Sequence, residues 1–155
     1  MIGHNITNLA EFRPLTVDGT NYLLAAGTSD VDSTVVDTLG YESCTFQVFV
    51  GTMAASSACD FQVQQGAASD GSDMADLTGS GSTQVSATDD NKMVLITIHR
   101  PQERYLRLQT IRGDGGNTTI NALGAILFNA RHNVTQSSTY VVSSEIHVTP
   151  AEGTA

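Results

Sequence analysis

Tryptophan is absent from this sequence of 155 residues, lysine occurs once (Lys92), and aromatic residues reach only 6% of the total. Charge is sparse and one-sided, because sixteen acids face seven bases and give a formal net charge of −9 at pH 7. Nucleic acid and anionic membranes repel an acidic protein, so we expect neither as a partner. The expected partner is a protein or a sugar.

Long hydrophobic runs are missing as well. No stretch approaches the ~20 apolar residues that cross a bilayer. The N-terminal MIGHNITNLAEF has neither the basic nor the apolar region of a secretory signal. We therefore expect no membrane span and no cleaved signal.

Motifs that carry chemistry are also absent. The four histidines are isolated from one another and the two cysteines form no C-x-x-C pair, so the sequence predicts no metal site. It contains no G-x-S-x-G elbow, no P-loop and no G-x-G-x-x-G placed between a strand and a helix. We expect a protein with no cofactor and no enzymatic activity, although sequence alone never excludes carboxylates paired from distant strands.

β-Strand signals dominate what is present. Apolar residues alternate with polar ones in residues 41–52 and 58–65, which is the period of half-buried strands. Cys44 and Cys59 lie on the apolar faces of these two strands. This position predicts buried, reduced thiols in preference to a disulfide or a catalytic thiol.

Residues 92–131 are the most strand-like part of the chain, and the other segments look arranged around them. A Pro101-Gln102-Glu103 turn and the glycine-rich residues 113–116 divide this part into three runs. Short connections between successive strands predict an antiparallel meander. The three strands would be residues 93–100, 105–112 and 118–130.

Further strands are expected on both sides of this region. Asp18-Gly19, between residues 15–17 and 22–26, predicts a hairpin. Residues 134–148 alternate well enough to predict one or two final strands.

Residues 66–82 (GAASDGSDMADLTGSGS) are rich in Gly, Ser and Asp and predict a surface loop. Asp70, Asp73 and Asp76 recur at intervals of three and could surround a calcium ion. The twelve-residue register of an EF-hand is missing, so solvated acids in a flexible loop are the favoured interpretation.

The run 118–130 is apolar on both faces, with Ile120, Ile126 and Phe128 on one side and Leu123 and Leu127 on the other. A strand of this kind is normally covered on both sides. In a two-layer sandwich the core covers one side, so an arm, a loop or another subunit must cover the second.

These patterns predict an all-β protein, an antiparallel β-sandwich of the jelly-roll type with an extended N-terminal arm. The arm would comprise residues 1–13, the single sandwich domain residues 14–149, and the C-terminal tail residues 150–155. Scattered apolar side chains in the arm are interpreted as contacts to a neighbouring subunit; the alternative is a frayed terminus. They are Ile2, Ile6, Leu9 and Phe12.

Four arginines lie within thirteen residues of an otherwise acidic chain. One interpretation is a set of subunit contacts, because arginine is enriched at protein interfaces and grips carboxylates. The other is ordinary solvated strand ends and cross-strand pairs with local acids such as Glu103. The four are Arg100, Arg104, Arg107 and Arg112.

The segment ERYLRLQTIRG followed by GAILFNARHNVTQ resembles small virion proteins of tailed bacteriophages, in particular capsid decoration (cement) proteins. The acidic character, the Ser/Thr/Gly content and the apolar N-terminus are similar as well. The resemblance covers about the C-terminal 60 residues. It implies a homotrimer that binds the outside of the expanded capsid and clamps neighbouring major capsid subunits.

Two other functions stay open. A carbohydrate-binding jelly roll, such as a host-surface adhesin, would need exposed aromatic platforms, which a sequence without tryptophan supplies poorly. A head-completion or tail component of the same virion would form rings in place of trimers.

Overall fold

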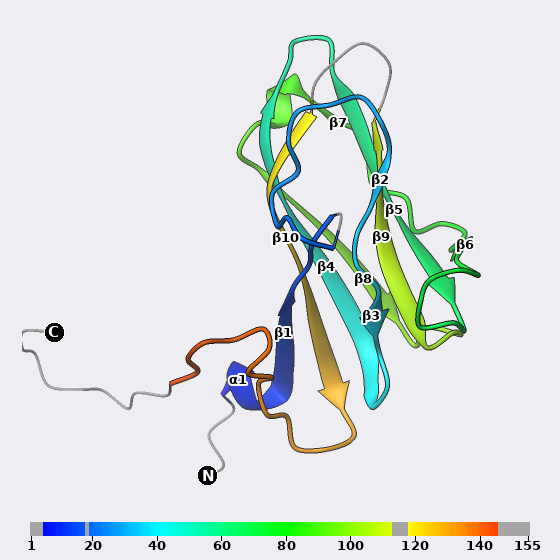
Figure 1. Cartoon of the computed structure of the whole chain (residues 1–155), viewed down its shortest axis with the longest axis vertical. Helices are drawn as coiled ribbons and strands as arrows, with labels where there is room; N and C mark the ends of the chain where they lie inside the picture. The colour runs from blue at the N-terminus through cyan, green and yellow to red at the C-terminus, as the bar shows by residue number, and fades with distance from the viewer. Residues whose placement is uncertain (1–4, 18, 113–117, 146–155) are drawn as a thin grey trace, which may run out of the picture.

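The computed structural model describes residues 5–17, 19–112 and 118–145 as two packed β-sheets with one short helix (Figure 1). The chain order is α1 (Ile6–Leu9), β1 (Ala10–Pro14), β2 (Val31–Asp32), β3 (Val36–Asp37), β4 (Tyr41–Met53), β5 (Ala58–Gly66), β6 (Ala75–Asp76), β7 (Val85–Ser86), the 3-10 turn η1 (Ala87–Asp89), β8 (Met93–His99), β9 (Tyr105–Arg112) and β10 (Thr118–Ala130).

Sheet A has the strand order β1-β10-β4-β8, and all its pairs are antiparallel. Sheet B is built on the antiparallel pair β5-β9. The short strands β2 and β3 pair with β9, and β6 and β7 pair with β5. The predicted antiparallel β-sandwich is confirmed, whereas the jelly-roll arrangement stays a prediction. No described helix is long and apolar enough to span a membrane.

The predicted meander is wrong, although its three strands are present at nearly the expected residues. β8 and β10 belong to sheet A and both pair with β4, while β9 belongs to sheet B and pairs with β5. The link after β8 therefore crosses between the sheets, and Arg100 opens it with a positive φ of 52°. Alternation shows which side of a strand is buried, but it does not identify the neighbouring strand.

Two further strand predictions are wrong for the described residues. Residues 22–26 form no regular strand, because only Leu24 bridges to Ile120. Asp18, part of the predicted hairpin turn, lies outside the described residues. Residues 131–145 contain no strand, and the rest of the predicted C-terminal strands, with the tail 150–155, lies outside the description.

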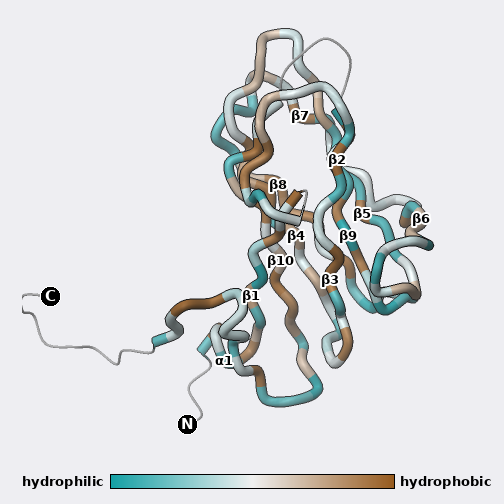
Figure 2. The backbone as a smooth tube through the Cα atoms, viewed as in Figure 1, coloured by the Kyte–Doolittle hydropathy of each residue, from teal (hydrophilic) through white to brown (hydrophobic). Residues whose placement is uncertain are grey.

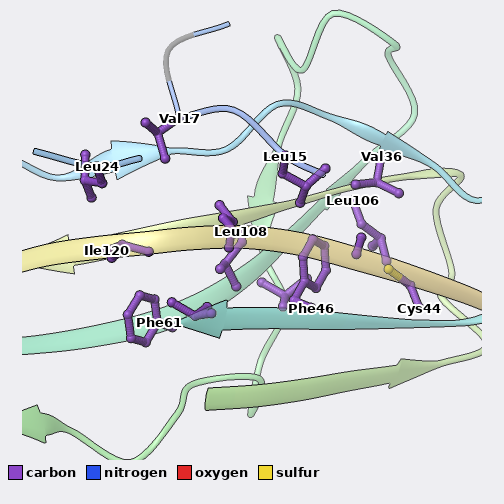
Figure 3. Packing of buried hydrophobic residues seen from close by; sticks show 14 of the residues in the cluster. Leu15, Val17, Leu24, Val36, Cys44, Phe46, Phe61, Leu106, Leu108 and Ile120 are labelled. Atoms are coloured by element: carbon purple, nitrogen blue, oxygen red, sulfur yellow. The ribbon is translucent and has the colours of Figure 1, made fainter. Parts of the chain in front are cut away.

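The core lies between the sheets and is made of the inward-facing residues of each long strand (Figure 3). Cys44 and Cys59 are both fully buried and free, as predicted. Figure 2 shows hydrophobic residues along the strands and hydrophilic ones in the loop after β10. The largest side chains with no exposed surface are Phe46, Phe61, Leu106, Leu108, Ile120 and Leu127.

A bulge in β10 changes the predicted faces of that strand. The pairing with β4 shifts between Thr118 and Ile120 and again between Ile120 and Ala122. An extra residue reverses the alternation, so Ile120 points into the core with Leu123 and Leu127. Placing Ile120 with Ile126 and Phe128 was therefore wrong.

The described part of the predicted arm (1–13) is not a free extension. Residues 10–14 form β1, which pairs with β10 from Ala10↔Phe128 to Pro14↔Gly124. The sandwich thus begins before residue 14, the predicted boundary. The segment that follows β10 lies beside this region (Figure 1), where Gln136 Nε2 donates to the carbonyls of Thr7 and Ala10, each at 2.7 Å.

Candidate docking face

The outer face of sheet A is the side that points away from sheet B. Its residues alternate along each strand with core residues such as Phe46 and Leu127, and the strand register places them in rows across the sheet. One row runs Phe12, Ile126, Thr45, Thr97. The face comprises Phe12, Thr45, Gln47, Phe49, Met93, Leu95, Thr97, Ala122, Ile126 and Phe128.

Large apolar side chains are exposed on this face. Phe49, Met93 and Leu95 have 44%, 47% and 54% of their surfaces exposed. Phe49 and Met93 are direct cross-strand partners, so their exposed surfaces adjoin. A contiguous exposed apolar surface is typical of a protein interaction site, whereas scattered single residues are not.

The helix α1 forms one wall of a groove on this face. Asn5 caps the helix, because its Oδ1 accepts from the Thr7 amide at 3.1 Å. Ile6 and Leu9, with 60% and 49% of their surfaces exposed, face the groove. The groove measures about 590 Å³, and its floor includes Leu95, Ile126 and Phe128.

Several polar groups on or beside this face bind one another. Thr45 and Thr97 share a hydrogen bond between their hydroxyls at 2.8 Å. Ser43 Oγ lies 2.8 Å from His99 Nδ1 and accepts from Asn129 Nδ2 at 3.3 Å. Because these groups already have partners, burying this part of the face would leave few polar groups unpaired.

The arrangement offers an apolar groove that is suited to binding. Within the described ranges, no group of three His, Cys, Asp or Glu side chains could hold a metal ion. Burial raises the pKa of both Cys44 and Cys59 to about 12, and a thiol of that pKa is a poor nucleophile.

Of the predicted N-terminal contact residues, three lie at this face. Ile6 and Leu9 line the groove, and Phe12 is half-buried opposite Ile126. Ile2 lies outside the described residues.

The four arginines do not gather in one patch. Arg104, Arg107 and Arg112 belong to sheet B or its approach, while Arg100 follows β8 of sheet A. Arg104 binds both carboxylate oxygens of Asp37, at 2.8 and 2.7 Å.

The other two arginines of sheet B also bind groups of their own chain. Arg107 Nη2 lies 3.0 Å from Asp32 Oδ2, and its Nε donates to Gln64 Oε1 at 2.6 Å. Arg112 is buried and donates to the Ala25 carbonyl at 2.9 Å. Arg100 is exposed and makes no ion pair with any described residue.

The alternation of residues 93–99 is enough to put Leu95, Thr97 and His99 on one face, and Phe49 interrupts the polar face of residues 41–52. These local patterns do not join the residues into a single surface. Doing so requires β8 to be the neighbour of β4, and only the tertiary pairing supplies that information.

The three aspartates of residues 66–82 accept separate hydrogen bonds, Asp70 and Asp73 within turns and Asp76 across the β5–β6 pair. Asp73 accepts from the amides of Ala67 and Ala68, and Asp70 accepts from the amide of Ser72 at 3.0 Å. Asp76 accepts from Gln64 Nε2 at 2.8 Å. Each of these carboxylates therefore accepts hydrogen bonds that hold its own part of the chain in place.

The chain matches no model of a known protein family and no curated protein.

Proposed function

We propose that this protein is a virion structural protein, a decoration protein that binds the outer surface of the expanded capsid of a tailed bacteriophage through the outer face of sheet A. The major capsid protein is its partner, and it stabilises the shell by clamping neighbouring subunits. The protein would assemble in the bacterial cytoplasm and work as a homotrimer on the virion.

The observation that carries the proposal is the exposed apolar face with its groove beside α1. A clamp needs a rigid body and a surface that loses water on binding. The sandwich supplies the body, and Phe49, Met93 and Leu95 supply the surface. The capsid assignment itself comes from the resemblance of residues 103–113 and 124–136 to phage virion proteins.

A sugar-binding role has less support. Tyr22, Phe49 and Tyr140 are aromatic residues with more than two-fifths of their surfaces exposed. Only Phe49 lies on the outer face of sheet A. Tyr22 and Tyr140 instead line a small hollow beside Arg13 and Pro14, together with Gly19.

Co-sedimentation with expanded capsid shells that lack this protein tests the proposal. We expect saturable binding at a few copies per capsid hexamer. A variant with Ile6→Ser and Leu9→Ser should bind at least about tenfold more weakly, because each truncation removes apolar surface worth about 1–2 kcal/mol.

Leu39→Ser is the matched control, because Leu39 is 65% exposed but does not line the groove. Its binding should equal that of the unmodified protein. If the folded protein does not bind shells, the decoration proposal fails, and binding to a glycan array would then support the adhesin alternative.

A further inference from the structure

Strand β8 ends sheet A, and no described strand pairs with its outer edge. Its seven residues, MVLITIH, include no proline, lysine or acid. Natural proteins usually protect exposed edges with such residues, because an open edge pairs readily with another strand. β8 lacks these protections.

The opposite edge of the same sheet is protected. On β1, the amide of Phe12 donates to Gln136 Oε1 at 3.1 Å, and Gln136 Nε2 donates to the Ala10 carbonyl at 2.7 Å. Pro14 has no amide hydrogen to offer. The contrast within one sheet indicates that the β8 edge is open for a partner strand.

The backbone of β8 presents its free groups in a regular order. Val50 donates to the Lys92 carbonyl at 2.9 Å, and Arg100 donates to the Glu42 carbonyl at 2.7 Å. The even-numbered residues therefore bond to β4. In an antiparallel ladder the alternate residues then direct their amides and carbonyls outward; these are Met93, Leu95, Thr97 and His99.

The core beside this edge is incompletely covered. Val94 and Ile96 point inward and pack against the core, yet both stay partly exposed. Two grooves of about 520 and 400 Å³ run along β8, and the segment 77–85, which links β6 to β7, contributes their other wall. An added strand would cover these two side chains.

We propose that the added strand is β8 of a second copy of this chain, paired antiparallel about a two-fold axis at Leu95. The outward groups of an antiparallel strand are self-complementary. In this register Val94 of one copy lies opposite Ile96 of the other, so apolar surface meets apolar surface. The two four-stranded sheets become one sheet of eight strands.

The strand itself carries no charge that would oppose this pairing. Its residues Met93–His99 include no Asp, Glu, Lys or Arg, so no like charges meet directly across the pair. Arg100, which follows the strand, makes no ion pair with any described residue of its own chain.

The proposal goes beyond the capsid function and is tested on the free protein. Two-fold pairing requires an assembly with an even number of chains. The assembly is a dimer if only β8 pairs, and a hexamer if the proposed trimer also forms. We expect light scattering at micromolar concentration to give such a mass. A mass of one or three chains for the unmodified protein would overturn the proposal.

Thr97→Pro removes one outward amide without touching the bonds to β4. The matched control Thr97→Val keeps that amide but loses the same hydroxyl contact to Thr45. We expect the mass of the proline variant to fall by half with its β-sheet circular dichroism intact, and the valine variant to keep the full mass. A folded proline variant of unchanged mass contradicts the pairing.

Cysteine cross-linking decides the question if the proline variant does not fold. In a pair centred on Leu95, the two Leu95 Cα atoms lie about 5.5 Å apart, and the two Thr97 Cα atoms about 14 Å apart. Leu95→Cys should therefore oxidise to a covalent dimer and Thr97→Cys should not. A Leu95→Cys variant that stays monomeric overturns the proposal.

Discussion

The hydroxyl of Tyr41 donates a hydrogen bond of 2.6 Å to Glu11 Oε2, which joins the start of β4 to β1 across the intervening strand β10. Glu11 also binds Arg13 Nε at 2.9 Å, and Arg13 Nη1 donates to the Asp37 carbonyl on β3. This group of three side chains thereby links the edge of sheet A to sheet B.

Removing the Tyr41 hydroxyl should destabilise the fold. Tyr41→Phe leaves the Glu11 carboxylate without one donor, and a hydrogen bond to a charged group contributes about 1.5–3 kcal/mol. The measurement is the midpoint of urea unfolding. Tyr22→Phe is the control, because Tyr22 is 54% exposed, and its midpoint should not move. Equal midpoints for all three proteins would show that the Tyr41–Glu11 bond adds nothing to stability.

The same group makes stability depend on acid pH. Burial alone would raise the pKa of Glu11, but hydrogen bonds from Arg13 and Tyr41 hold this pKa below its usual value of 4.5. The unfolded chain then takes up this proton at a higher pH than the folded chain, so the Glu11 contribution is complete above pH 4.5 and is lost as the pH falls through the lower, folded pKa.

A Glu11→Gln variant measures that contribution. Its unfolding free energy should be lower than that of the unmodified protein at neutral pH, and the gap should narrow through the acid range. A gap that stays constant with pH would mean that the charge of Glu11 has no role.

Gly40 is predicted to resist substitution. Its φ is +88°, and an added Cβ would lie 2.9 Å from Cε1 of His132, whose ring packs edge-on against Tyr41. A non-glycine residue in the left-handed region costs about 1–3 kcal/mol, so Gly40→Ala should lower the melting temperature. Gly81→Ala, where nothing lies within 4 Å, should leave it nearly unchanged.

Two ion pairs of sheet B should differ in their effect on stability. Arg104 and Asp37 are 46% and 37% exposed, so Arg104→Met should cost at most about 1 kcal/mol. The Arg107 side chain is 22% exposed and donates to Gln64 as well as pairing with Asp32. Arg107→Met should therefore lower the free energy of unfolding by about 1.5–3 kcal/mol. Urea unfolding measures the free energy of unfolding that each variant loses. A larger loss for Arg104→Met than for Arg107→Met would contradict this prediction.

The thiols should be inert until the fold opens. With pKa values of about 12, Cys44 and Cys59 carry on the order of one thiolate in 10⁵ at neutral pH. A chromogenic disulfide reagent should label neither cysteine in the native protein and both in urea. Fast labelling of a native cysteine would mean that the core opens locally.

Particular residues show how far the sequence leads. The alternation around Phe46 and Phe61 predicted β4, β5 and the buried cysteines correctly, because a half-buried strand leaves its period in the sequence. Asp18-Gly19 predicted a hairpin whose second strand, residues 22–26, is not regular, since Leu24 bridges to Ile120, almost a hundred residues away. A turn signal acts over four residues and cannot anticipate a competing distant strand.

The candidate docking face was predictable only in part. Ile6, Leu9 and Phe12 were recognised as apolar residues in need of cover, and they lie at the groove or beside it. The close spacing of the arginines left two interpretations open, subunit contacts or pairs with acids of the same chain. The chain crosses between sheets after Arg100, so the four side chains are distributed over two sheets and most bind acids or carbonyls of the same chain.

Local periodicity and composition were sufficient to predict the long strands β4, β5, β8, β9 and β10, the burial of most of their alternate residues, the acidic net charge and the free buried thiols. The tertiary structure alone decided that β8 lies beside β4, that Ile120 faces the core and that one edge of sheet A is protected while the other is open. Strand pairing depends on hydrogen bonds between residues far apart in the chain. A local sequence pattern does not show with which distant strand a given strand will pair.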